Sequence, residues 1–125
     1  MSDPVKTEVD CDHIIYSDWL RQSVFVFTDF DRACEELSRL GSPSIVMGEA
    51  GAGYSDHPDG SAVFWMVFKT DNPRIATVVH EAVHVADYLC EFTGIPITPD
   101  NVEVRCYLTE WLVSEVLAYF NRDNQ

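Results

Sequence analysis

Long apolar runs and helically spaced apolar positions divide the chain into distinct elements. Residues 23–28 and 62–69 are almost continuously β-branched or aromatic, which is typical of strands that are covered on both faces. Two further strands are predicted over residues 44–47 and 50–55, and the second is predicted to be an edge strand with glycines where another backbone approaches closely. These runs predict a small sheet.

Apolar residues recur with helical spacing in four other segments. A short helix is predicted over residues 14–22, and a longer one over residues 29–40, where a glycine ends it. A third helix is expected to begin with Asn72 as its cap and to end near position 93. The last helix covers residues 99–120. The pattern therefore predicts an α+β fold, with a mostly antiparallel sheet of three or four strands packed on helices.

The composition predicts a single domain with a hydrophobic core. The chain has 125 residues, of which 46% are apolar and 12% aromatic, and a chain of this size folds as one unit. Residues 1–12 are polar and acidic, so we expect a flexible tail and no secretion signal. No stretch reaches the ~18 apolar residues of a membrane span. The cysteines lack C-x-x-C spacing, which predicts a reduced, cytoplasmic protein. They are Cys11, Cys34, Cys90 and Cys106.

The formal net charge of the chain is -13. An acidic surface of this kind repels nucleic-acid phosphates and anionic lipids. The charge therefore argues against direct nucleic-acid binding and against a membrane surface. A dense acidic surface can instead occupy the basic groove of another protein.

Residues 80–84 read His-Glu-Ala-Val-His within an otherwise apolar helix. Because an α-helix repeats every 3.6 residues, His80 and His84 lie one turn apart on one face, and their rings can converge on one ion. Glu81 points partly toward the same space and can take a proton from water on that ion. Two histidines and a glutamate are costly to bury without partners. This segment therefore predicts a metal site.

A third protein ligand is expected from the last helix, which folds back after a tight reversal. Glu103 is the leading candidate, because it follows His84 by 19 positions and lies in the first turns of that helix. Glu110, Asp87 and His57 remain alternatives. Asp87 also shares a face with both histidines of the motif, from which it could orient a ligand imidazole.

The pattern H-E-x-x-H, eighteen residues, then Glu resembles the gluzincin branch of the zinc metallopeptidases. The sequence around residues 78–89 and 101–112 is also similar to small zincin-like proteins of bacteriophages and prophages. The resemblance covers residues 62–117, about half of the chain. It implies a zincin-like domain in which the H-E-x-x-H helix and the C-terminal helix form the metal site. For a phage-encoded protein it also implies the host cytoplasm.

The resemblance implies a specific chemistry for these residues. Zn²⁺ is held by His80, His84 and Glu103, with water in the open fourth position. Glu81 acts as general base and then carries the proton to the leaving amine. A tetrahedral intermediate needs a further donor of a hydrogen bond. The candidates for this donor are His57, Tyr107 and Tyr54.

The leading functional hypothesis is a small zinc-dependent metallohydrolase, a peptidase that acts on a peptide or protein. The chain leaves no second subdomain to wall a cleft, so the edge strand over residues 50–55 would hold an extended peptide by strand addition. The alternative is an acidic, non-enzymatic interaction protein of phage origin, either a virion component or an inhibitor that fills a basic groove of a host protein. In a third hypothesis the metal is structural, and a fourth protein ligand closes the site.

Overall fold

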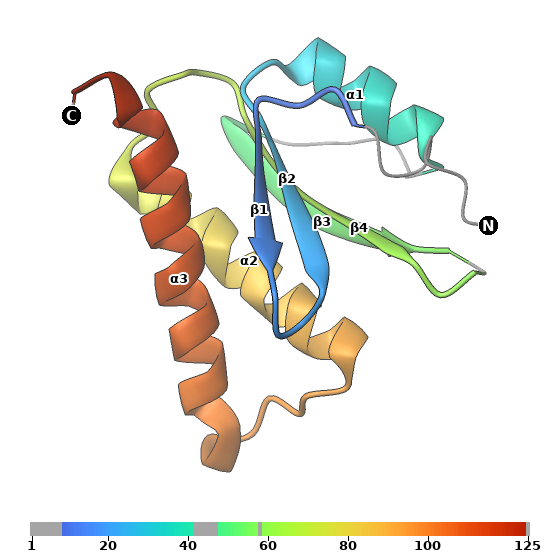
Figure 1. Ribbon diagram of the computed structural model, residues 1–125. Coiled ribbons are helices and arrows are strands. Elements are labelled where there is room, and N and C mark those ends of the chain that lie inside the picture. The colour runs from blue at the N-terminus through green and yellow to red at the C-terminus, as the bar shows by residue number, and fades with distance from the viewer. Residues whose placement is uncertain (1–8, 42–47, 58, 125) are drawn as a thin grey trace.

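The computed structural model describes residues 9–41, 48–57 and 59–124, which form an α+β fold (Figure 1). A four-stranded sheet lies between one helix on one face and two helices on the other. The strands are β1 (His13–Ser17), β2 (Gln22–Phe27), β3 (Ala50–Asp56) and β4 (Ala62–Phe68). The main helices are α1 (Phe30–Arg39), α2 (Ile75–Thr93) and α3 (Val102–Phe120).

The sheet has the strand order β1-β2-β4-β3. The β1–β2 and β3–β4 pairs are antiparallel, whereas β2 and β4 run parallel in the centre. The sheet is therefore mixed, with two of its three pairings antiparallel. The predicted edge strand over residues 50–55 is confirmed as β3. The strand predicted over residues 44–47 falls outside the described residues.

The two central strands are buried on both faces, as their continuous apolar runs predicted. One face of β2 and β4 packs on α2 and α3. The other face packs on α1, where Ala33 and Leu37 are buried. Because neighbouring side chains of a strand point to opposite faces, both odd and even positions of these strands must be apolar.

The helix predicted over residues 14–22 is wrong, because this segment forms β1 and the turn into β2. Ile15 and Ser17 are buried, whereas Ile14 and Tyr16 are exposed, which is the two-residue alternation of a strand. The turn is held by Ser17, whose hydroxyl and carbonyl oxygens accept bonds from the next turn residues. The apolar residues of this short run fit both the helical and the strand periodicity. Pairing with β2 decides in favour of the strand.

The cap predicted at Asn72 is also wrong. Helix α2 begins at Ile75, with Arg74 as the capping residue in an extended conformation and no side-chain cap. Asn72 would be the cap if Pro73 were the first helical residue, but helical backbone begins only at Ile75, two residues after the proline. The backbone N–H of Asn72 instead donates to the Thr70 hydroxyl. The end of α2 at Gly94, which has a φ of 78°, agrees with the sequence prediction.

Gly53 allows β3 to lie close against its neighbour. A Cβ atom at this position would lie 2.5 Å from Cζ2 of Trp65, the residue paired with it on β4. Sequence reasoning predicted that a backbone approaches these glycines, but at Gly53 the neighbour is an indole ring. A side chain at Gly53 would therefore require that ring to shift.

The last part of the predicted N-terminal tail is attached to the body of the protein. The backbone N–H of Asp12 donates to the Val26 carbonyl, and that of Asp10 donates to the Glu36 carboxylate. The Asp12 carboxylate also forms an ion pair with Arg32 on α1. These bonds fix residues 9–12 beside the sheet.

Among the helices of the described segments, none is both long and apolar enough to cross a membrane.

Candidate metal centre

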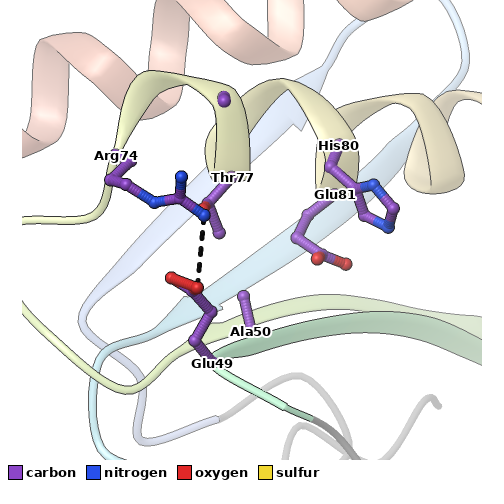
Figure 2. A pocket seen from close by; sticks show the side chains of 7 residues that line it. Glu49, Ala50, Arg74, Thr77, His80 and Glu81 are labelled. Atoms are coloured by element: carbon purple, nitrogen blue, oxygen red, sulfur yellow. Dashed lines mark hydrogen bonds and ion pairs between the residues drawn. The ribbon is translucent and has the colours of Figure 1, made fainter.

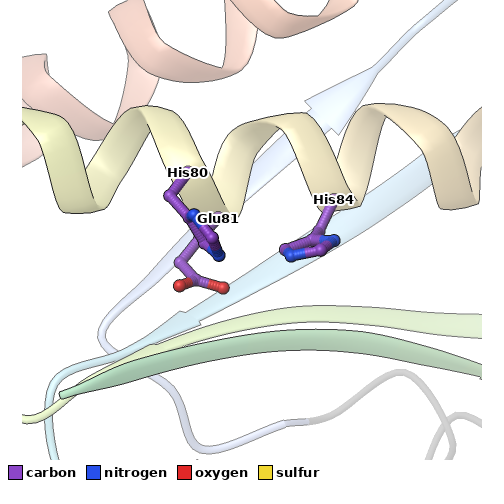
Figure 3. Close-up of side chains that lie close together, drawn as sticks. All are labelled: His80, Glu81 and His84. Carbon is purple, nitrogen blue, oxygen red and sulfur yellow. The ribbon is translucent and has the colours of Figure 1, made fainter. Parts of the chain in front are cut away.

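Three side chains of the H-E-x-x-H segment gather on one side of α2 (Figure 3). One potential ligand atom from each of His80, Glu81 and His84 lies within 4.8 Å of the others. The two imidazole ring centroids are 4.9 Å apart. All three side chains project from the helix toward the strands of the sheet (Figure 3). The helical spacing therefore brings the two rings together, as the sequence predicted.

The three residues differ in exposure because α2 rests on the sheet. Val78, Ala82 and Val85 are fully buried beneath the helix, and Glu81 points to the same side with 6% of its surface exposed. His80 and His84 lie at the margin of this contact and are exposed. The site is thus a buried carboxylate flanked by two accessible imidazoles.

Burial raises the pKa of Glu81 above its ordinary value, and the nearby His80 and His84 offset this only in part. Removal of water disfavours the charged form of a carboxyl group. Among the described residues, no hydrogen bond or ion pair to Glu81 is formed. A carboxylate whose pKa is raised by burial and that lines an open pocket is a candidate for a proton acceptor.

A pocket of about 340 Å³ opens beside the cluster at the start of α2 (Figure 2). Its walls carry charged groups, small alanines and a buried threonine. They are Glu49, Ala50, Arg74, Ala76, Thr77, His80 and Glu81. Arg74 donates to the Glu49 carboxylate at 3.2 Å and so links the start of α2 to the start of β3. The pocket gives a molecule from solvent access to His80 and Glu81.

Aromatic rings occupy the other side of the cluster. The ring of Tyr88, one turn after His84, stacks on it with centroids 6.2 Å apart and an angle of 16° between the planes. Tyr54 on β3 contacts Tyr88 at 5.2 Å and also contacts Phe92. These contacts hold the His84 imidazole against an aromatic wall.

The donor set fits a metal ion. Two imidazole nitrogens with a nearby carboxylate suit zinc and other divalent transition metals, whereas calcium and magnesium prefer oxygen ligands only. The cluster of His80, Glu81 and His84 could therefore hold a metal ion.

The structure does not bring Glu103 into this cluster. Within the described segments, the compact group of potential ligands consists of His80, Glu81 and His84. Glu103 is exposed in the first turn of α3. Helix α2 packs against β3 with one side and against α3 with another, and the three cluster side chains point toward the strands (Figure 3). Its role as third ligand stays a prediction.

The alternatives to Glu103 also lie outside the cluster. Asp87 accepts two hydrogen bonds from Arg105 on α3, at 2.6 and 3.2 Å. This carboxylate therefore joins α2 to α3, where the sequence had suggested that it orients a histidine. Glu110 is exposed on α3. Both acids belong to the helix pair and contribute nothing to the compact group.

The proposed hydrogen-bond donors are spread over the molecule. The His57 ring lies near Gly41, where a Cβ would be 3.9 Å from its Cε1 atom. Tyr107 is 65% exposed and lines a separate groove with Trp19 and Trp111. Tyr54 is the nearest of the three, because its ring touches the ring that stacks on His84. Burial, then the charge of Glu91, raises the pKa of Tyr54.

Sequence reasoning missed two residues of the pocket, Glu49 and Arg74. Glu49 lies in a glycine-rich stretch without periodicity, and Arg74 lies just before the helix. No local pattern shows that these two positions meet. Their proximity follows from the pairing of β3 with β4, which returns the start of β3 to the start of α2.

Comparison with family models, with curated proteins and with solved structures finds no match for this chain.

Proposed function

We propose that this protein is a small zinc-dependent metallohydrolase of the peptidase class. The single observation that carries the proposal is the grouping of His80, Glu81 and His84 within 4.8 Å beside an open pocket. The resemblance of this segment to the gluzincin motif is the reason for proposing zinc as the metal and peptide hydrolysis as the reaction.

In this proposal His80 and His84 hold the ion through ring nitrogens. Zinc bound there would supply a Lewis acid that polarises a carbonyl group and lowers the pKa of water. Glu81 takes a proton from the attacking water and delivers it to the leaving amine.

The position of β3 favours an extended peptide as the substrate. β3 is an edge strand of the sheet, and it lies beside α2. A peptide can add to such an edge through backbone hydrogen bonds. Ala50 of β3 lines one pocket with His80 and Glu81, so a peptide added to this edge would run beside the cluster. No additional domain is required for this binding mode.

Zinc stoichiometry tests the proposal. Protein purified without chelator should contain one zinc per chain by elemental analysis, and His80→Ala or His84→Ala should lose it. His57→Ala is the matched control, because its ring lies outside the cluster, and it should keep the metal. Absence of zinc in the unaltered protein, even after incubation with excess ion, would contradict the proposal.

Hydrolysis is tested with a peptide mixture of broad sequence and mass spectrometry of the products. Zinc-loaded protein should release new termini, and EDTA should stop the release until zinc is restored. Zinc binding without any cleavage would favour a structural metal, which also requires a fourth protein ligand.

The alternative is an acidic interaction protein, supported by the net charge of -13. Such a protein would occupy a basic groove of its partner through charge complementarity. Glu81→Gln separates the two functions because it removes the base while keeping the size of the side chain. A biological effect that persists in this variant would favour the interaction protein.

A further inference from the structure

We infer that the Arg74 side of the pocket binds a carboxylate of the substrate, next to the bond that is cleaved. This inference rests on the proposed hydrolase function and adds a substrate class to it. The ligand chemistry is a carboxylate, which an acidic side chain or the C-terminus of a peptide can supply.

The first support is the chemical asymmetry of the surface on either side of the cluster. Toward the start of α2, the pocket is lined by Arg74, Glu49 and Thr77 (Figure 2). Toward the end of α2, Tyr88 stacks on His84 and Tyr54 packs behind it. A substrate that lies along β3 across His80 and His84 therefore meets charged groups on one side and aromatic rings on the other.

The second support is the availability of the guanidinium group. Arg74 has 72% of its side chain exposed, and its partner Glu49 has 65% exposed. Ion pairs this exposed contribute little to stability. A guanidinium carries five N–H donors, and one bond at 3.2 Å to Glu49 leaves the others for a ligand. The bond to Glu49 orients the Arg74 guanidinium across the pocket and leaves some of its N–H donors without a partner in this pair.

The third support is the small number of cationic side chains in the protein and their positions. The chain carries only 8 Lys and Arg residues against 21 Asp and Glu. In the described part of the chain, Arg32, Arg39 and Arg105 pair with acids of α1, α2 or the N-terminal segment. Arg74 is the cationic residue that lines the pocket of His80 and Glu81. Guanidinium groups bind carboxylates in a planar, two-bonded geometry.

The test measures peptide binding rather than turnover. Zinc-loaded Glu81→Gln protein is titrated with acetylated, amidated peptides that differ only in Asp or Asn at one position, scanned along the peptide. A second pair differs only in a free or an amidated C-terminus. In one of these pairs, the peptide that carries the carboxylate should bind about tenfold more tightly than its partner without it. The pair that shows the difference identifies the source of the carboxylate.

Two variants in the Glu81→Gln background should change this preference in opposite directions. Arg74→Gln should abolish the tenfold difference by weakening the anionic peptide alone. Glu49→Gln should increase it by about two- to threefold, because it removes a competing carboxylate. If the Arg74–Glu49 pair only attaches α2 to β3, both variants should affect all peptides equally, and that result overturns the inference.

Direct binding of the peptide carboxylate to the ion is a distinct outcome. In that case the anionic peptide keeps its advantage in Arg74→Gln, and the inference is overturned while the metal site stands. Zinc content and cleavage of neutral peptides by protein with an intact Glu81 test the proposed function separately. A protein that binds zinc and cleaves neutral peptides, but shows no preference for a carboxylate, contradicts only the role of Arg74.

Discussion

Two carboxylates, Asp12 and Glu81, are both withdrawn from solvent but have opposite surroundings. Burial would raise the pKa of Asp12, yet the bonds from Arg32 and from the Thr28 backbone N–H outweigh it and lower that pKa. Glu81 is more buried, has no hydrogen-bond donor among the described residues, and its pKa is raised. The Asp12 carboxylate is thus bonded within the protein, whereas the Glu81 carboxylate has no bond to another described residue.

The difference indicates what each group does. A paired carboxylate holds elements together, and Asp12 joins the N-terminal segment to both β2 and α1. A carboxylate that lines a pocket and whose pKa is raised by burial is instead a candidate for proton exchange with a ligand. On this comparison Asp12 is a structural residue, and Glu81 is the group to which we assign the role of general base in the proposed function.

The largest expected effect is on catalysis. Glu81→Gln should lower the rate of peptide hydrolysis by about 10²- to 10⁴-fold, because it removes the general base. Zinc content should stay at the level of the unaltered protein, since the two imidazoles remain. Elemental analysis and a cleavage assay on the same sample check both statements.

Asp12→Asn should also retain its zinc content, but its rate of hydrolysis should stay close to that of the unaltered protein. A loss of hydrolysis as large as that in Glu81→Gln, in folded and zinc-loaded protein, would break the comparison.

The next effect is on stability. Asp12→Asn should lower the free energy of unfolding by about 1–2 kcal/mol at pH 7, because Arg32 loses a charged acceptor in a partly buried position. Urea unfolding monitored by fluorescence measures the change. Asp71→Asn is the control, since Asp71 is exposed, and it should alter stability by less than about 0.5 kcal/mol.

The stabilisation from Asp12 depends on pH in a defined direction. Its pKa in the folded protein lies below the ordinary value of 3.8, so the unfolded chain takes up the proton first as the pH falls. The contribution is fully present above 3.8 and is lost as the pH drops through the folded pKa. The difference between the unaltered protein and Asp12→Asn should therefore shrink below pH 4. A difference that is constant from pH 6 to 2.5 would contradict the pairing.

Glu81→Gln should have a smaller effect on stability, with the opposite sign. In metal-free protein at pH 7, it should raise the free energy of unfolding by about 1 kcal/mol, because burial disfavours the charged form of the carboxyl group and the amide carries no charge. Urea unfolding in EDTA measures this change. Glu115→Gln on the exposed side of α3 is the control. A clear loss of stability in Glu81→Gln would show that the carboxylate has a structural role.

The smallest expected effect concerns Glu103. Its position outside the cluster predicts that Glu103→Gln changes zinc affinity by less than about twofold, within ordinary surface effects. Competition with a chromophoric chelator gives the affinity. A loss as large as that in His84→Ala would show that Glu103 is the third ligand, as the sequence pattern suggested.

Much of the fold could be predicted from local patterns. The runs that form β2 and β4 are apolar at both odd and even positions, and the ends of α1 and α2 are marked by Gly41 and Gly94. The β1 segment was misassigned because five residues are too few to distinguish the periodicity of a helix from that of a strand. Its conformation is decided by pairing with β2, which is a tertiary effect.

The site was predictable only where it is local. His80, Glu81 and His84 meet because of helical spacing alone. The expected contribution of Glu103 depended on how α3 crosses α2, and sequence spacing does not fix that angle. The pocket residues Glu49 and Arg74 meet through strand pairing, which no pattern of either segment encodes.

The parallel pairing of β2 with β4 has a consequence for the order in which the chain folds. Val24 pairs with Phe64 across a long stretch that contains α1 and β3, and closing such a loop costs more entropy than closing a hairpin. The β3–β4 hairpin and the helix after it are contiguous, and they carry the pocket, the imidazoles and Glu81. We therefore expect residues 50–93 to begin organising as a unit before the N-terminal hairpin joins them.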